Sequence, residues 1–485
     1  MRRLVAAVCA LPLLWTACAG KPAKPTPGQD ILRPPEEWLR EESIRLLRDY
    51  VRIDTRLARG EEEGAEFLRR FFDCAGIPVE VVCPAPRRCN VLARLEGRRH
   101  DGALLLLNHI DVVDAFPQFW KEAPPFEGKI KGGYLYGRGS YDMKSLGLAE
   151  ALAVRNLKRR GIVPATDVLF LAEADEEIGQ KWGARWLLEH RPEWFAGVRQ
   201  VVNEGGTTEV ILRDVRYWGI EALQAGYGLA EFESDADQPL AHLSDAWPRL
   251  SATPVVPDPQ VVAGFDLLAN HLLSPLTDPL RHLDRVRRNP DELAILPDRY
   301  GSFLEPRINW SVVYHHPDSP ATFRRLVVVS VPPGVSPHPY IAPILRQAQL
   351  LGLRVLTSVE SESTKSSPYP TAFTDLLQRV TEAHFPGVPF GPVPTFGGYT
   401  TSILLRERGI PTYGYQPIPM NIGDASRRHG NDERVFLRDY LIGVALLGDV
   451  LEEFAVFPPE ALRQPTSITP TASASKSLSG ENRPK

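Results

Sequence analysis

Three consecutive acids follow an apolar run in the segment LFLAEADEEIGQKWGAR, residues 169–185. The run has the composition of a buried strand, and it ends directly at Asp175, Glu176 and Glu177. Carboxylates are rarely fully buried unless they are paired or bind a metal ion. We therefore expect these acids to take part in metal binding or in acid–base chemistry.

Further candidate ligands follow neighbouring apolar runs. His109 and Asp111 come after LLLLN, and Glu204 comes after QVVN. In an open parallel sheet, ligands gather at the carboxyl ends of the strands, where these residues are predicted to lie. The H-x-D pair is informative because a metal-bound imidazole needs a second hydrogen-bond acceptor, and Asp111 could hold His109 in the correct tautomer.

Asp142 and His429 complete the candidate set. Asp142 lies in YGRGSYDMKS, a glycine-rich loop that opens a helix, and His429 lies in RRHGNDERV before the last helix. Two histidines and three or more carboxylates at one sheet edge would form a two-metal site with the nitrogen and oxygen ligands that zinc prefers. Each residue alone would more often be a solvated side chain than a ligand. The hypothesis therefore depends on their occurrence together.

Strand and helix patterns alternate in the part of the chain that must position these residues. Strand-like segments are IPVEVVC, NVLARLEG, GALLLLNHIDVVD, TDVLFLAEA and RQVVNEGG, and helical segments are predicted at Glu37–Arg52, Glu63–Cys74, Lys144–Arg160 and Trp182–Glu189. This alternation predicts an α/β fold with a mostly parallel sheet that helices cover on both faces.

The alternation is lost beyond about Tyr217 and returns later in the chain. Residues 218–357 are rich in proline and aspartate and contain strand-like pieces such as RINWSVVY and RRLVVVSV, which indicates an inserted α+β domain. The α/β pattern resumes with a helix in TAFTDLLQRVTEAHF, a strand in GIPTYGYQP and a long amphipathic helix that begins at Arg434. We therefore predict a main domain formed by residues 31–217 and 358–457, and a disordered Ser/Thr/Pro-rich tail at residues 458–485.

The N-terminus, MRRLVAAVCALPLLWTACAG, has the layout of a secretory signal: two arginines, a short apolar stretch and small residues. Residues 1–20 are predicted to be a signal peptide and residues 21–30 a linker, and an ordinary buried helix is the alternative. The segment LLWTAC resembles a bacterial lipoprotein signal, although Trp15 replaces the usual aliphatic residue. We therefore expect an exported protein, either periplasmic or attached to the membrane through a lipidated Cys18.

Charge and cysteine content restrict the choice of partners and compartment. The formal net charge of −4 shows no basic excess, so nothing points to nucleic acid, and a small molecule or peptide is the expected partner. Cys83 and Cys89 flank the turn-like PAPRR and could form a disulfide in an exported protein. Free thiols at Cys74, Cys83 and Cys89 are an equally favoured alternative.

The combined pattern resembles the family of co-catalytic di-zinc exopeptidases that includes aminoacylase, glutamate carboxypeptidase and succinyl-diaminopimelate desuccinylase. The match runs through NHIDVVD, GRGSYDMKS, AEADEEIG, VVNEGG and RHGNDERV, in the order and approximate spacing of the family. The resemblance covers the two α/β parts of the chain. It makes the main domain the catalytic domain and residues 218–357 a lid, through which two copies could pair as a homodimer.

The resemblance also implies roles for the candidate residues. Asp142 would bridge two Zn²⁺ ions, with Mn²⁺ or Co²⁺ as the alternatives, and a cis peptide bond would follow it. One ion would add His109 and Glu204 as ligands, and the other would add Glu177 and His429. Glu176 would be the general base, Asp111 would support His109, and Asp175 would support the loop. The implied reaction is hydrolysis of an amide bond without a covalent intermediate.

The substrate-facing segments depart from the pattern of the family. The lid normally carries a histidine that stabilises the oxyanion, but no such motif is present, and His242 is only the nearest histidine in sequence. Relatives often place an arginine before PG where this chain has Ser330, and GGYTTS at residues 397–402 replaces the usual GGTD. The identity of the substrate therefore cannot be taken from a relative.

Two functions remain open on the sequence alone. The first is an exported di-zinc metallohydrolase that cleaves an amide bond of a small peptide or an N-acyl amino acid. The second is a non-catalytic, metal-containing binding lipoprotein with the same fold. The presence of Glu176 favours the enzyme, because a general base has no purpose in a purely structural metal site.

Overall fold

The computed structural model describes residues 29–211, 214–246, 255–271, 276–316, 319–393, 399–458 and 460. The predicted signal peptide with Cys18, residues 21–28 of the predicted linker and residues 461–485 of the predicted tail lie outside this range. Within the described residues, no helix combines the length and the apolar character that crossing a bilayer requires.

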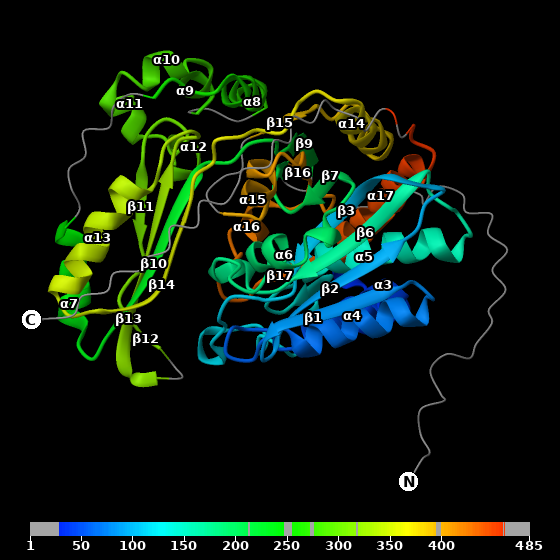
Figure 1. Ribbon diagram of the computed structural model, residues 1–485, viewed down its shortest axis with the longest axis horizontal. Coiled ribbons are helices and arrows are strands. Elements are labelled where there is room, and N and C mark those ends of the chain that lie inside the picture. Colours follow the sequence, from blue (N-terminus) through cyan, green and yellow to red (C-terminus); the bar gives the residue numbers. More distant parts are fainter. Residues whose placement is uncertain are drawn as a thin grey trace, which may run out of the picture.

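A six-stranded sheet forms the centre of the larger part of the molecule (Figure 1). Its strands, in spatial order, are β1 (Val79–Ala85), β2 (Arg88–Leu95), β6 (Thr166–Glu173), β3 (Arg99–His109), β7 (Val198–Asn203) and β16 (Thr412–Gly414). The last four strands in this order run parallel to one another. The prediction of an α/β fold with a mostly parallel sheet is therefore confirmed.

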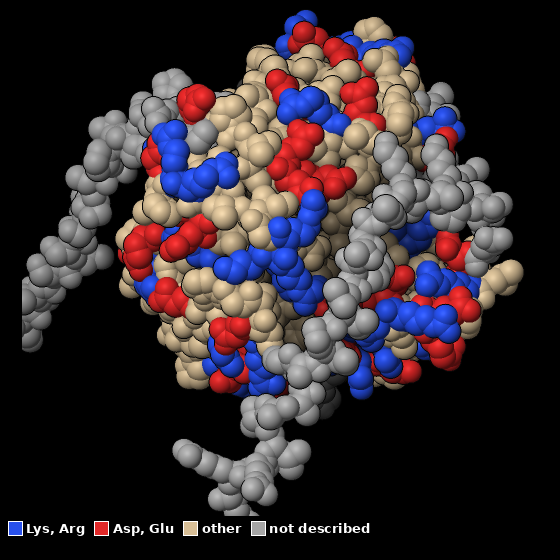
Figure 2. Space-filling model, turned by 90° about the vertical axis from the view of Figure 1, so that its right-hand side faces the viewer, with Lys and Arg blue, Asp and Glu red and all other residues tan. Residues whose placement is uncertain are grey.

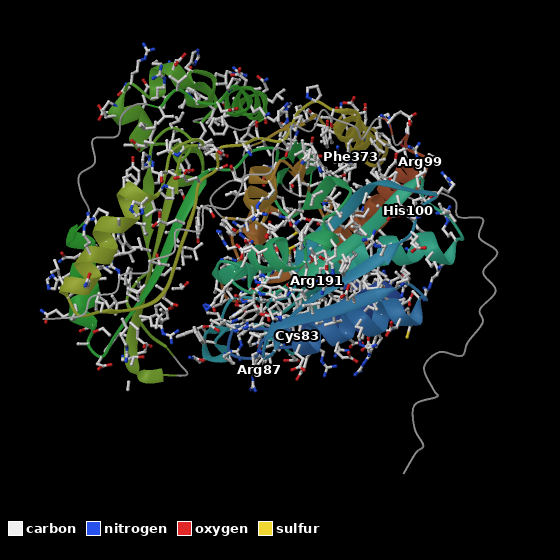
Figure 3. All side chains as sticks on the ribbon, viewed as in Figure 1. Cys83, Arg87, Arg99, His100, Arg191 and Phe373 are labelled. Atoms are coloured by element: carbon white, nitrogen blue, oxygen red, sulfur yellow. A yellow bond between two sulfur atoms is a disulfide. The ribbon has the colours of Figure 1, made fainter. Side chains whose placement is uncertain are left out.

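The edge formed by β1 and β2 is the antiparallel part of the central sheet. Only two residues separate β1 from β2, and Arg87 in this turn has a positive φ of 63°. So short a turn can join antiparallel strands, whereas parallel strands need a long crossover. The turn also brings Cys83 and Cys89 together in a disulfide (Figure 3). Of the two predicted alternatives, the disulfide is therefore confirmed and free thiols at these two positions are not.

Helices on both faces bury the leucine run of β3. Leu104 and Leu106 belong to the core that includes residues of α5, whereas Leu105 and Leu107 belong to the core that includes residues of α6. Because successive strand residues point to opposite faces, a strand that is covered on both faces needs an uninterrupted apolar run. The principal helices of this part are α3 (Glu42–Val51), α4 (Glu62–Cys74), α5 (Lys144–Arg159), α6 (Ala184–His190), α14 (Ala372–His384), α15 (Ser402–Glu407) and α17 (Leu437–Ala455).

Shorter elements complete this part of the chain. The helix predicted at Glu37–Arg52 is divided, because α2 ends at Trp38 and α3 begins at Glu42. The remaining elements are α1 (Gln29–Leu32), α2 (Pro35–Trp38), α16 (Ile422–Ala425), a sheet of β4 (Lys129–Lys131), β5 (Tyr134–Tyr136) and β17 (Arg434–Phe436), and a sheet of β8 (Thr207–Ile211), β9 (Asp214–Ile220) and β15 (Phe390–Pro392).

A second, five-stranded antiparallel sheet lies beside the first part (Figure 1). It contains β10 (Gly226–Ser234), β11 (Arg307–Trp310), β12 (Tyr314–His316), β13 (Ser319–Val331) and β14 (Arg354–Ser361). Val327, Val329 and Val331 pack against Ile341 and Ile344 of α13 (His338–Leu350) on one face. Figure 1 places α13 and α7 (Asp237–His242) on the side away from the central sheet, so the other face of the second sheet is turned toward it.

A group of short helices extends from the second sheet and has its own core, which includes Phe265, Tyr300 and Phe303. These helices are α8 (Pro259–Ala269), α9 (Thr277–Arg281), α10 (Leu283–Val286), α11 (Pro290–Ala294) and α12 (Asp298–Gly301). On the face of the molecule drawn in Figure 2, acidic and basic side chains are interspersed, and neither sign dominates.

Candidate metal centre

The predicted ligands converge at the carboxyl end of the central sheet in two groups that share Asp142. In the first group, His109 Nε2 lies 3.2 Å from Asp142 Oδ1 and 3.8 Å from Glu204 Oε1. His109 ends β3, and Glu204 follows the last residue of β7, which is the next strand in the sheet. The parallel pairing of β3 and β7 therefore brings these two residues together.

In the second group, His429 Nε2 lies 3.0 Å from Asp142 Oδ2 and 3.1 Å from Glu177 Oε2. Asp142 directly precedes the cis peptide bond to Met143, at the position that the family resemblance implies. The two carboxylate oxygens of Asp142 thus face different groups. This arrangement allows one carboxylate to contact two cations.

Asp111 holds the loop that carries the two glutamates. Its Oδ1 accepts a hydrogen bond of 3.1 Å from the main-chain N–H of Glu176, and its Oδ2 accepts one of 3.0 Å from that of Glu177. His109 Nδ1 donates to the main-chain oxygen of Asp111 at 2.9 Å, while the Asp111 carboxylate is 3.6 Å away. The expected support of the His109 tautomer is therefore given chiefly by the carbonyl group of Asp111. Because Nδ1 is held by this bond, Nε2 is the ring nitrogen turned toward Asp142 and available to a metal ion.

Asp175 supports the turn after β6, as the resemblance implies. It adopts a left-handed conformation with a φ of 67°, which aspartate tolerates better than most residues. Its main-chain oxygen accepts a hydrogen bond of 2.7 Å from the N–H of Gln180. The turn presents Glu176 and Glu177 to the same cavity.

Glu176 is buried beside the ligand groups, with an exposed fraction of 6%. Burial raises the pKa of its carboxyl well above the usual value, and the negative charge of Glu204 adds to the effect. Gln180 Nε2 lies 3.5 Å from Glu176 Oε1 and also donates to Thr401, which in turn donates to Glu173. Glu176 thus lies beside both candidate ligand groups without belonging to either of them.

The segment GGYTTS, which departs from the family pattern, contributes to this network. Tyr399 donates a hydrogen bond to the side-chain oxygen of Gln180, and Thr401 bonds to its side-chain nitrogen. Gly397 and Gly398 lie outside the described residues. The described part of this segment therefore supports the glutamine that approaches Glu176.

A buried ion pair between Arg138 and Glu433 was not singled out by the sequence interpretation. Glu433 Oε1 accepts from the main-chain N–H groups of Tyr141 and Asp142 at 2.8 and 3.1 Å, and its Oε2 lies 2.5 Å from Arg138 Nη1. Arg138 Nη2 also donates to the main-chain oxygen of Gly430, at 3.0 Å. This pair joins the loop of Asp142 to the loop of His429. Glu433 lies within the quoted motif RHGNDERV, but its partner is 295 residues away in sequence.

The charges of the two groups fit divalent cations. Burial and the neighbouring Asp142 raise the pKa of Glu204 to about 8. Burial lowers the pKa of His429, but Glu177 and Asp142 outweigh this effect and raise it to about 10. The cluster therefore attracts positive charge at neutral pH, in the form of protons when no other cation is bound.

The geometry and chemistry of the donors also fit metal ions. Two ligands of one tetrahedral zinc ion, each about 2 Å from it, lie about 3.3 Å apart, which is close to the distances of 3.0 to 3.8 Å between the facing atoms. Glu177 Oε1 is buried and makes no hydrogen bond, although a buried carboxylate oxygen normally has a partner. Imidazole nitrogens with carboxylate oxygens suit zinc, manganese or cobalt.

A cavity of about 590 Å³ lies between this centre and the second sheet. Its lining includes Glu176, Arg428 and His429 on one side, and Tyr227 and Ser330 on the other. Ser330 therefore faces the cavity, at the position where relatives often have arginine. His242 ends α7 and does not line the cavity.

Comparisons with known proteins give a family match and several relatives. The model of peptidase family M20/M25/M40 matches residues 105–453. A probable succinyl-diaminopimelate desuccinylase of Staphylococcus aureus is 34% identical over 149 residues, which are 31% of this chain and 36% of that protein. Mouse aminoacylase-1 is 26% identical over 437 residues, which are 84% of this chain and 94% of that enzyme.

The fold is similar to that of solved structures. The match to the crystal structure of human carnosine dipeptidase 1 covers 88% of this chain and 100% of the chain in that structure. Its TM-score is 0.65 and the sequence identity is 15%. At this identity the likeness concerns the fold. Because the family model matches well over half of the sequence, this chain belongs to peptidase family M20/M25/M40.

Proposed function

We propose that this protein is an exported, metal-dependent hydrolase that cleaves an amide bond of a small peptide or an N-acyl amino acid. The observation that supports this proposal most strongly is the arrangement of two ligand groups around Asp142, with Glu176 buried next to them. Mouse aminoacylase-1, which is similar over most of the chain, supports an acylated amino acid as the substrate.

His109, Asp142 and Glu204 would hold one metal ion, and Asp142, Glu177 and His429 would hold the other. We propose zinc as the metal. Two divalent ions at such a site provide Lewis acidity toward a carbonyl oxygen and lower the pKa of a water molecule.

The residues of the protein perform the proton transfers. Glu176 accepts a proton from the water whose oxygen forms a new C–O bond to the amide carbon. It then delivers this proton to the nitrogen as the C–N bond breaks and the amine departs. Burial favours this role because the raised pKa of Glu176 makes its carboxylate a stronger base than an exposed one. Asp111 keeps the Glu176 loop in position through its two main-chain hydrogen bonds.

Export and membrane attachment form part of the proposal. They are supported by the pattern of residues 1–20, and the disulfide between Cys83 and Cys89 is typical of proteins in oxidising compartments. Fractionation of cells that produce the full-length chain tests this point. Lipidation predicts a membrane-associated protein that becomes soluble when Cys18 is replaced by serine.

The enzymatic proposal is tested by screening dipeptides and N-acyl amino acids with zinc, manganese or cobalt, before and after chelation. We expect hydrolysis that chelation abolishes and that added metal restores. A fully metal-loaded protein that hydrolyses none of these amides would contradict the proposal and would favour the non-catalytic binding protein.

A further inference from the structure

The face of the second sheet that is turned toward the metal centre carries a row of aliphatic side chains. Val328 of β13 pairs in register with Leu229 of β10, and Leu229 pairs with Val359 of β14. Directly opposed residues of antiparallel strands point to the same face, and all three residues line the cavity. We call Leu229, Val328 and Val359 the apolar row. Leu326, two residues before Val328 on β13, extends the same surface.

The apolar row is distinct from the core of the second sheet. Val327 and Val329, the neighbours of Val328, are buried against α13 on the opposite face and have exposed fractions of 0%. Val328 and Val359 are only half-buried, although they lie inside the molecule next to the cavity. Packing within the protein therefore leaves part of each of these two side chains accessible to a ligand.

The part of the second sheet that lines the cavity carries no charged side chain among the described residues. Its other lining residues are Tyr227, Asn309 and Ser330. Arg307 pairs in register with Ser330, but its side chain bonds to the Leu293 carbonyl and to Glu305. Arg324 lies further along β13 on the same face, but it is paired with Glu231 and Glu233 and does not line the cavity. An ionised group placed against the lining part would therefore lose its hydration without gaining a partner of opposite charge, which is strongly unfavourable.

The arginine of the cavity comes from the opposite side. Among the described lining residues, Arg428 is the only arginine or lysine, and its Nε lies 3.9 Å from Asp142 Oδ2. A substrate carboxylate is therefore favoured near Arg428, on the loop of His429. The remainder of such a substrate then extends from the metal centre toward the apolar row.

We propose that the substrate is an N-acyl amino acid whose acyl group is uncharged and apolar, and that the apolar row binds this acyl group. The inference rests on the proposed amide hydrolysis and specifies its substrate class. A cavity of about 590 Å³ lies within the range typical of small-molecule sites. Acyl groups that end in a carboxylate are poor substrates, because the row offers them no cation.

The test compares kcat/KM of the zinc-loaded protein for N-acetyl, N-butyryl, N-octanoyl, N-succinyl and N-glutaryl derivatives of one amino acid. We expect the octanoyl compound to exceed the acetyl compound by at least about tenfold, because its added methylene groups leave water for the row. The kcat/KM of the octanoyl compound should exceed that of the glutaryl compound by a larger factor. Equal or faster hydrolysis of the acetyl, succinyl or glutaryl compound would overturn the inference and leave amide hydrolysis intact.

Hydrolysis of dipeptides alone would likewise overturn the acyl assignment. Failure to hydrolyse any amide would instead overturn the proposed function, and the inference with it.

A charge-introducing variant locates the specificity in the row. Val328→Lys places a cation at its centre, so we expect kcat/KM for the octanoyl compound to fall by about tenfold or more and that for the glutaryl compound to rise. Ser358→Lys is the matched control, because Ser358 is exposed and precedes Val359 on the same strand, with its side chain on the other face. This control should keep the wild-type preference.

If Val328→Lys folds with the wild-type melting temperature and also keeps the wild-type preference, the row does not bind the acyl group. Val328→Ser provides a milder change should the lysine variant fail to fold. It should lower kcat/KM for the octanoyl compound and leave that for the acetyl compound nearly constant.

Discussion

Replacement of Glu433 by alanine tests whether the buried ion pair with Arg138 holds the metal-binding loops together. Glu433 is fully buried and Arg138 has an exposed fraction of 2%, so the change leaves a buried guanidinium without its counter-ion. It also removes the acceptor of the main-chain N–H groups of Tyr141 and Asp142. Breaking a buried pair by removing one partner costs about 3 to 5 kcal/mol. We expect the free energy of unfolding of the metal-free protein to fall by about this amount.

The assay is urea denaturation of the metal-free variant together with a titration of its zinc affinity. Because Glu433 positions the main chain of Asp142, the affinity should fall as well. Glu122→Ala is the matched control, since Glu122 also forms an ion pair, with Lys131, but on the surface. Surface pairs contribute little, so this variant should resemble the wild type in both measurements. If Glu433→Ala unfolds like the control and binds zinc with wild-type affinity, the positioning role is refuted.

Three further predictions concern the base, the disulfide and the ionisation of the site. Glu176→Ala should lower kcat by about 10²-fold or more while metal content, measured by mass spectrometry, stays near wild type; loss of metal would contradict its assignment as a base. Joint replacement of Cys83 and Cys89 by serine should lower the free energy of unfolding by about 2 kcal/mol, because the disulfide closes a loop with a sequence separation of only 6. An unchanged thermal midpoint would refute this estimate. In metal-free protein, folding raises the pKa of Glu204 from 4.5 to about 8 and that of His429 from 6.5 to about 10. The folded state therefore binds more protons than the unfolded chain, so the free energy of unfolding should fall as the pH rises from 5 to 9, by roughly a kcal/mol or more. Zinc should weaken this dependence, and a stability that rises with pH in metal-free protein would be the contrary result.

The residues of the candidate centre could be predicted from sequence because each follows a local signal. The apolar runs before His109, Glu176 and Glu204 mark strand ends, and parallel strands bring such ends to one edge of a sheet. The acids after β6 are recognisable because charged residues seldom follow a buried strand without a partner. The strand order that makes β3 and β7 neighbours, however, comes from the structure.

Features that depend on contacts between distant segments could not be predicted in this way. Glu433 is one acid among several in its motif, and only the fold brings it to Arg138. The segment RRLVVVSV is apolar on both faces, so its pattern does not indicate which residues face the cavity. The pairing of β13 with β10 and the packing of α13 decide that Val327 and Val329 enter the core while Val328 faces the metal centre.

Metal content measured on purified variants tests the central claim most directly. By mass spectrometry, the wild type should bind about two divalent ions per chain, and His429→Ala should retain about one. Asp142→Ala should retain neither at the same free zinc concentration, because both ligand groups share this carboxylate. His100→Ala, an exposed histidine away from the centre, should match the wild type. Undiminished binding of two ions by Asp142→Ala would contradict a shared, two-metal centre.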